Sequence, residues 1–201
     1  MKILSIVNQK GGVGKTTTSI NLSACLFKMK RKVLLIDLDP QSNTTRGSGV
    51  DSGNLDYSIN DVLLDRVDIN DAIITAVHDG YDLLPATPSL TESEVNLVSR
   101  DNREFILRDQ LSMVLNQYDY ILMDCPPSLN ILTVNSLVSA TGVLIPVQCE
   151  FYALQGLSEL INTINQIQNS SNEKLKIEGI LRTMFDSRNN LYNDVSDQFK
   201  E

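Results

Sequence analysis

Short runs of consecutive apolar residues alternate along this chain with longer stretches in which apolar residues recur every three or four positions. The short runs suit strands that are buried on both faces of a sheet, and the periodic stretches are typical of amphipathic helices. The predicted strands are Lys2–Asn8, Lys32–Asp37, Tyr81–Leu84, Tyr120–Asp124, Gly142–Val147 and Lys176–Thr183. The predicted helices are Thr16–Lys28, Arg103–Asn116, Leu132–Ser139, Leu157–Gln168 and Tyr192–Phe199.

This alternation predicts an α/β fold, a mainly parallel sheet with helices on both faces. The segment Arg46–Asn60 is rich in Gly, Ser, Asn and Asp and shows little periodicity, so we expect a mobile loop there. The 201 residues contain no internal repeat, low-complexity tract or domain linker. We therefore expect residues 1–201 to form a single domain.

The composition is that of an ordinary soluble globular protein, with 42% hydrophobic and 21% charged residues. A net charge of −8 argues against a surface that is basic all over, although it leaves room for a local basic patch. No apolar run approaches the roughly 18 residues of a membrane span, and the chain starts with a strand pattern where a signal peptide would stand. These features predict a cytoplasmic protein without membrane contact.

The cysteines and the histidine offer no metal or triad chemistry. Cys25, Cys125 and Cys149 lie far apart at apolar-rich positions and are interpreted as buried thiols. His78 is the only histidine, so a zinc site or a histidine-based triad would lack its partners.

A glycine-rich segment, Gln9–Thr17, follows the first predicted strand and precedes the first predicted helix. Glycines let several backbone N–H groups point at one phosphate, and the start of a helix adds its positive dipole end. A plain strand-to-helix turn is the alternative, but the fixed positions of three glycines, two lysines and a threonine favour a phosphate loop. The predicted ATP-binding residues are Lys10, Gly11, Gly12, Val13, Gly14, Lys15, Thr16 and Thr17.

Two side chains of this loop have the chemistry that nucleotide binding needs. Lys15 is placed to reach the β- and γ-phosphates, and the Thr16 hydroxyl suits a Mg²⁺ ligand. The loop departs from the common Walker pattern, which has glycine where this chain has Gln9, and it carries an additional lysine, Lys10.

Acidic residues end two of the predicted strands. Asp124 ends one, and Asp37 ends another and is followed by Asp39. Ligands of open α/β sheets bind beyond the carboxyl ends of the strands, so these carboxylates should converge on the phosphate loop. We expect Asp124 to hold Mg²⁺ through water and Asp39 to position or deprotonate the attacking water. Asp37 either joins the metal site or orients Thr16 or a metal-bound water. For each of the three acids, the alternative is a structural role, in which the carboxylate caps the following turn.

Four strings, KGGVGKTTT, DLDPQSNTT, YDYILMDCPPSL and IPVQCEFYALQGL, resemble the ParA/Soj branch of the deviant Walker A ATPases. The resemblance runs from Met1 to about Leu191 and is to the short, chromosomal type. It implies a Mg²⁺-dependent ATP hydrolase that forms a sandwich dimer with ATP, in which Lys10 reaches the nucleotide of the partner subunit. The dimer of this family binds DNA non-specifically on the nucleoid and is released when a ParB-like protein stimulates hydrolysis.

The resemblance also implies a role for Arg188, which matches an arginine of the DNA-contacting surface of the family. Without the resemblance, a single loop arginine is more simply a solvated one. The family normally continues for several tens of residues beyond Glu201, so the chain is expected to lack a C-terminal segment of the family.

Three other functions share parts of this pattern. A MinD-like membrane-cycling ATPase has the same loop and acids, but it needs a basic amphipathic C-terminal helix. An iron–sulfur ATPase would need two well-placed thiolates at a dimer face, and neither Cys125 nor Cys149 lies in a glycine-rich cluster loop. A small ATP-dependent synthetase would need a substrate pocket that the sequence does not identify.

Overall fold

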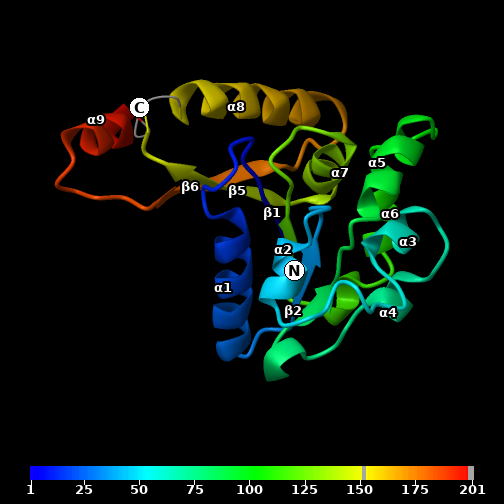
Figure 1. The fold of residues 1–201 in the computed structure, drawn as a ribbon. Coiled ribbons are helices and arrows are strands. Elements are labelled where there is room, and N and C mark those ends of the chain that lie inside the picture. Colours follow the sequence, from blue (N-terminus) through cyan, green and yellow to red (C-terminus); the bar gives the residue numbers. More distant parts are fainter. Residues whose placement is uncertain (151–152, 199–201) are drawn as a thin grey trace.

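The computed structural model describes residues 1–150 and 153–198, and its centre is one six-stranded sheet (Figure 1). The strand order is β3-β2-β4-β1-β5-β6, and all five neighbouring pairs are parallel. The strands are β1 Lys2–Ile6, β2 Val33–Asp37, β3 Asp82–Leu84, β4 Tyr120–Asp124, β5 Gly142–Gln148 and β6 Lys176–Thr183. The predicted parallel α/β sheet and all six of its predicted strands are confirmed.

Helices connect successive strands, as parallel pairing requires. Those that lie between the phosphate loop and β3 are α1 Lys15–Lys28, α2 Asn43–Gly47, α3 Ile59–Leu63, α4 Ile69–Ala72 and the 3-10 helix η1 Val77–Asp79. Those that follow β3 are α5 Leu90–Val98, α6 Ile106–Leu111, η2 Leu115–Gln117, α7 Ile131–Ser139, α8 Ala153–Ser170 and α9 Asn190–Gln198. The expected end of the last helix at Phe199 lies outside the described residues.

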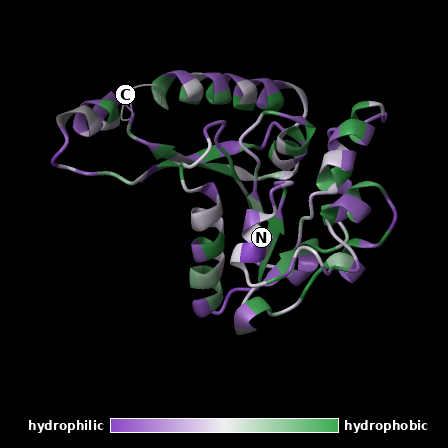
Figure 2. Ribbon diagram, in the orientation of Figure 1, coloured by the Kyte–Doolittle hydropathy of each residue, from purple (hydrophilic) through white to green (hydrophobic). Residues whose placement is uncertain are grey.

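Both faces of the sheet are covered, and β2 shows this residue by residue. Leu34 and Ile36 belong to a core under α7 and α8, whereas Val33 and Leu35 belong to a second core under α1. Successive strand residues point to opposite faces, so an uninterrupted apolar run is needed wherever both faces are covered. On the outside, α8 alternates hydrophobic and hydrophilic residues along its length (Figure 2).

The expected loop Arg46–Asn60 is largely irregular, but its ends fall inside α2 and α3. The helix predicted over Arg103–Asn116 is shorter in the structure and is divided into two parts. These are α6, Ile106–Leu111, and the 3-10 helix η2, Leu115–Gln117. The amide oxygen of Asn135 in α7 accepts a hydrogen bond from the Leu107 N–H at 3.0 Å, which fixes the first turn of α6. A tertiary contact therefore sets this boundary.

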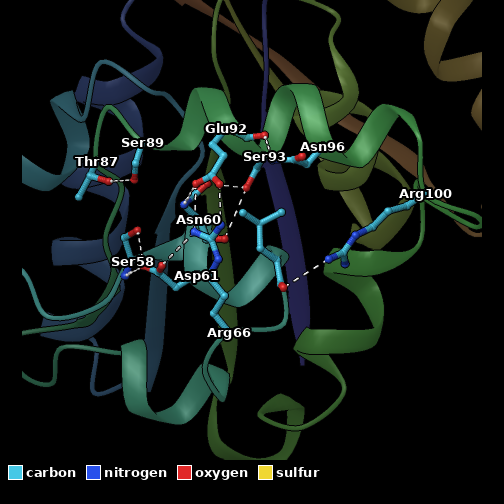
Figure 3. A network of polar contacts seen from close by, with 11 residues as sticks. Ser58, Asn60, Asp61, Arg66, Thr87, Ser89, Glu92, Ser93, Asn96 and Arg100 are labelled. Carbon is cyan, nitrogen blue, oxygen red and sulfur yellow. Dashed lines mark hydrogen bonds and ion pairs between the residues drawn. The ribbon is translucent and has the colours of Figure 1, made fainter.

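Polar contacts hold α5, which was not predicted, against α3 (Figure 3). The buried Ser93 hydroxyl donates to the Asn60 amide oxygen at 2.7 Å, and the Arg66 guanidinium pairs with the Glu92 carboxylate at 2.5 Å. The outward side of α5 carries the exposed apolar residue Val95, which weakens the amphipathic pattern. Hydrophobic periodicity therefore gave no clear signal for this helix.

Candidate functional site: a phosphate loop and its acids

The loop between β1 and α1 has the backbone that its glycines predict. Gly12 has a φ of 75° and Gly14 a φ of 86°, a left-handed conformation that other residues adopt only with strain. The end of β6 holds this loop in place, because the Thr183 hydroxyl donates to the Val13 carbonyl at 2.8 Å. The loop is thus anchored by a strand that lies far from it in the sequence.

A cavity of about 420 Å³ lies at the carboxyl edge of the sheet, within the size range of small-ligand sites. A Cβ atom built at Gly11 or Gly12 would meet no other atom within 4 Å, so the backbone there is open to an incoming ligand. The residues that line the cavity are Gly11, Gly12, Gly14, Lys15, Thr16, Thr17, Asp39, Gln41, Asn43 and Pro127. The phosphate loop and Asp39 are therefore brought together.

The Lys15 side chain is largely buried in this cavity and has few partners. Its ammonium donates to the Lys10 carbonyl at 3.1 Å. Burial lowers the pKa of Lys15 from its ordinary value, and the nearby Asp124 carboxylate opposes that change. A partly desolvated ammonium at the base of a glycine-rich loop is well suited to bind an anion.

Three hydroxyl groups converge on the Asp124 carboxylate at the end of β4. Thr16 donates to Oδ2 at 2.8 Å, Thr44 donates to Oδ2 at 2.6 Å, and Ser19 donates to Oδ1 at 3.1 Å. Burial raises the pKa of Asp124, while these hydrogen bonds hold it down. Asp124 therefore fixes the Thr16 hydroxyl beside the cavity. Sequence reasoning missed the other two donors, although Ser19 stands one helical turn after Lys15.

Asp37 has a different place from the one expected, since it does not line the cavity and does not bind Thr16. Its Oδ2 accepts the Thr45 N–H and hydroxyl at 2.8 and 2.7 Å, and its Oδ1 accepts the Asp39 N–H at 3.1 Å. Burial, and after it the charge of Asp124, raises the pKa of Asp37 to about 7. These contacts match the turn-capping alternative, because Asp37 accepts backbone N–H groups of the segment that carries Asp39. A part for Asp37 in the metal site or beside a metal-bound water stays a prediction.

Asp39 lines the cavity at the start of the segment after β2. Its Oδ1 accepts the Gln41 N–H at 2.9 Å, which is the turn-capping contact expected of a structural aspartate. Its Oδ2 makes no hydrogen bond with the described residues. One oxygen therefore orients the side chain, and the other is left for a ligand or a water molecule.

Lys10 is exposed at the rim of the loop, where its ammonium forms an ion pair with the Glu150 carboxylate of the same chain. Glu150 follows β5 and gave no sequence signal as a site residue. The pair joins residues 140 positions apart in the sequence, so only the fold reveals it.

Arg188 lies in the segment after β6, and its side chain is 88% exposed. Its guanidinium pairs with Asp186 through two hydrogen bonds, at 2.9 Å from Nε and 2.7 Å from Nη2. The predicted DNA-contacting residue is thus on the surface but is paired with a neighbouring carboxylate.

Two of the three cysteines have the expected burial. Cys125 and Cys149 are buried, and burial raises the pKa of the Cys125 thiol to about 11. The prediction was wrong for Cys25, which is exposed because it falls on the outward side of α1, away from Ser19 and Ser23. A protonated, buried Cys125 does not offer the surface thiolate that a cluster shared between subunits needs.

Known proteins share the sequence that builds this site. A family model described as an AAA domain matches residues 1–177. The sporulation initiation inhibitor protein Soj of Bacillus subtilis is 48% identical over 200 residues, which are 100% of this chain and 79% of that protein. The chromosome partitioning protein ParA of Myxococcus xanthus is 49% identical over 199 residues, which are 99% of this chain and 70% of that protein. The chain belongs to the ParA/Soj family.

A solved structure extends the likeness to three dimensions. It is the crystal structure of cobyrinic acid a,c-diamide synthase from Mycobacterium smegmatis with a bound ATP analogue and magnesium. The TM-score is 0.94 with 39% sequence identity, and the match covers 98% of this chain and 81% of that one. The synthase name applies to that protein, whose identity to this chain is lower than that of Soj or ParA.

Membership of the ParA/Soj family confirms the predicted function, a ParA-like partitioning ATPase of the P-loop type. Nothing in these matches favours the MinD-like alternative. Across residues 1–150 and 153–198, no helix combines the length and the apolar character needed to cross a membrane.

Proposed function

We propose that this ParA/Soj-family chain acts as one P-loop domain that binds ATP with Mg²⁺ and hydrolyses it to ADP and phosphate. The observation that carries the proposal is a single cavity lined by the open glycine loop, the buried Lys15 side chain and Asp39. One carboxylate oxygen of Asp39 caps the turn, and the other has no hydrogen bond with the described residues. The M. smegmatis structure, which contains an ATP analogue and magnesium, supports the choice of ligands.

The residues present fit a nucleotide triphosphate with its metal. Gly11 and Gly12 are exposed, with open space beside their backbone for a phosphate. The Lys15 ammonium can exchange the Lys10 carbonyl for β- and γ-phosphate oxygens. The Thr16 hydroxyl, oriented by Asp124, would ligate Mg²⁺ directly, and Asp124 would hold it through water. Bound there, Mg²⁺ would neutralise charge on the β- and γ-phosphates.

Asp39 is the residue that we assign to hydrolysis. Its capped Oδ1 fixes the side chain, and its Oδ2 is available to accept a hydrogen bond from the attacking water. The water oxygen bonds to the γ-phosphorus as the bond to the ADP oxygen breaks, and the proton that the water loses passes to the Asp39 carboxylate, which then releases it. Lys15 offsets the charge on the phosphates. Preorganisation by the turn supports this role, because a carboxylate that is already oriented needs no reordering in the reaction.

We propose that ATP drives formation of a sandwich dimer through Lys10. An exposed ion pair such as Lys10–Glu150 contributes less than about 1 kcal/mol, so a partner's triphosphate, with its larger negative charge, can replace the Glu150 carboxylate. The same lysine then offsets the repulsion between two nucleotides that face each other.

The dimer would bind DNA without sequence preference on the nucleoid of a cytoplasmic compartment, and a ParB-like protein would release it by stimulating hydrolysis. Arg188 is our candidate for a phosphate contact. Its exposed guanidinium would exchange Asp186 for a DNA phosphate, which positions DNA without reading its bases.

The direct test of ATP binding is Lys15→Gln. Loss of the buried ammonium should weaken binding of ATP with Mg²⁺ by at least about 100-fold, since two or more charge-assisted hydrogen bonds disappear. Isothermal titration calorimetry measures the change, and Lys174→Gln, which removes an exposed lysine from the segment before β6, is the matched control. Wild-type affinity in the Lys15 variant would refute the proposed phosphate site.

A further inference from the structure

A second cavity, of about 960 Å³, lies at the edge of the sheet opposite the phosphate loop. Its walls come from the end of α1, the turn that follows it, and the segments just before β3 and β4. The 14 residues of α1 span about 21 Å. The first residue of this helix, Lys15, lines the phosphate-loop cavity, and its last, Lys28, lines the second cavity. The two cavities share no lining residue.

Positive charge is concentrated at this second cavity in a chain whose net charge is −8. Four of its lining residues are exposed cations from five consecutive positions: Lys28, Lys30, Arg31 and Lys32. None of these side chains forms an ion pair or a hydrogen bond with any residue in the described part of the chain. A basic side chain near the end of a helix is commonly explained by the helix dipole. That effect is confined to the last turn and does not require four cations around one hollow.

The turn that carries the cations has a fixed backbone. The Arg31 N–H donates to the Leu26 carbonyl at 3.1 Å, and the Lys30 N–H donates to the Phe27 carbonyl at 2.7 Å, which together form a Schellman motif. Lys30 occupies its left-handed position with a φ of 61°, where glycine is usual. The charges are therefore held on an ordered turn.

The rest of the lining suits an anion that also carries a ring. Asp82 is the one acid among the described residues that line the cavity, and it already accepts the Tyr118 hydroxyl at 2.8 Å and the Ala76 N–H at 2.9 Å. Phe27, which lines the cavity with the cations, is 40% exposed as a residue. Unpaired cations next to an accessible aromatic ring are a combination that binds phosphate and stacks a base.

We propose that this basic cavity is a second ligand site, separate from the ATP site, for a phosphate-bearing nucleotide unit. The cations bind the phosphate, and Phe27 offers its face to the base. The unit can be a free dinucleotide or the end of a single-stranded nucleic acid, because both present the same phosphate and base.

The test uses fluorescence anisotropy of a labelled 5′-phosphorylated diadenylate with wild-type protein, Lys15→Gln, Lys30→Gly and Lys174→Gln. Glycine suits the left-handed turn, so Lys30→Gly removes the charge without disturbing the backbone. We expect about a tenfold weaker affinity for the dinucleotide in Lys30→Gly, the loss of one charge-assisted contact. Lys15→Gln and Lys174→Gln should bind the dinucleotide as wild type does, and Lys30→Gly should keep its affinity for ATP.

The pattern of losses decides the proposal. Equal loss in Lys30→Gly and Lys174→Gln would mean general charge attraction, and loss in Lys15→Gln alone would place the dinucleotide in the ATP site; either overturns the inference. Absence of binding to the wild-type protein at about 1 mM dinucleotide, a binding free energy of about −4 kcal/mol, overturns the inference as well. Tighter binding of hexaglutamate than of the dinucleotide also overturns it. A labelled 12-nucleotide single strand distinguishes the two sources of the ligand. If Lys30→Gly weakens the binding of both the dinucleotide and the strand, the site is supported. If it weakens the binding of the strand more, nucleic acid is the source.

Discussion

At the scale of single residues, Asp124 gathers more hydrogen bonds than its position at a strand end implies. Thr16, Ser19 and Thr44 all donate to it, and it is almost fully buried. When a buried carboxylate loses a hydrogen-bond donor, its burial is less well compensated and the free energy of unfolding falls. The hydroxyls are thus part of the site as much as the carboxylate is.

Thr44→Val tests how much a hydrogen bond to Asp124 contributes to stability. The variant keeps the shape of the side chain but removes the shortest hydrogen bond to Asp124, so the free energy of unfolding should fall by about 1–3 kcal/mol. Urea denaturation followed by circular dichroism measures it. Thr163→Val is the control, because that hydroxyl is exposed and bonds only to the carbonyl of Glu159 in its own helix. Equal effects of the two substitutions would contradict the account.

At this scale, most residues of the phosphate site could be predicted from the sequence, but few of the residues that surround it could. The glycines, Lys15, Thr16 and Asp39 lie in two short motifs, so their pattern predicts their place. The Lys10–Glu150 pair joins segments 140 residues apart, and a contact of this kind has no signal in a single sequence. The sequence left the role of Asp37 open for a similar reason, since its partner Thr45 is supplied by the fold of the segment after β2.

At the scale of elements, strands were predictable and one helix was not. Burial on both faces demands continuous apolar runs, which is why β2 and β4 stand out in the sequence. α5 combines two core residues, Leu90 and Leu97, with a polar contact in which Asn60 and Ser93 are buried between it and α3. Because Val95 and Val98 of the same helix are exposed, its apolar residues do not mark one face, and hydrophobic periodicity gives little signal.

Asn60→Ala tests whether this network holds α5. Asn60 accepts from Ser93 at 2.7 Å and donates to Glu92 at 3.3 Å, so the substitution leaves a buried hydroxyl without its partner. The free energy of unfolding should fall by about 1–3 kcal/mol. Arg66→Gln, which removes exposed ion pairs to Glu92 and Asp61 and leaves the buried Asn60–Ser93 contact in place, should have the smaller effect. The reverse order in urea denaturation would show that the surface pair dominates.

At the scale of the whole molecule, the proposed cycle depends on a second subunit. Lys10→Ala should leave ATP binding to the monomer largely intact, because we assign the phosphates of its own site to Lys15 and the loop backbone, which line the cavity. It should abolish the ATP-dependent dimer, which static light scattering detects. Lys174→Ala is the control for the loss of an exposed charge. Normal dimers of the Lys10 variant with ATP would reduce Lys10 to the partner of Glu150 alone.

The central claim is that nucleotide binding and hydrolysis are separate steps, and that Asp39 serves the second. Asp39→Ala removes the carboxylate oxygen that faces the cavity but leaves Lys15, Thr16 and Asp124 in place. The most direct measurement is phosphate release by this variant with ATP and Mg²⁺, made beside its ATP affinity and its co-sedimentation with DNA. We predict release at least about 100-fold slower, as for loss of a general base, with normal ATP affinity and protein retained on DNA. Phosphate release at the wild-type rate would contradict the account.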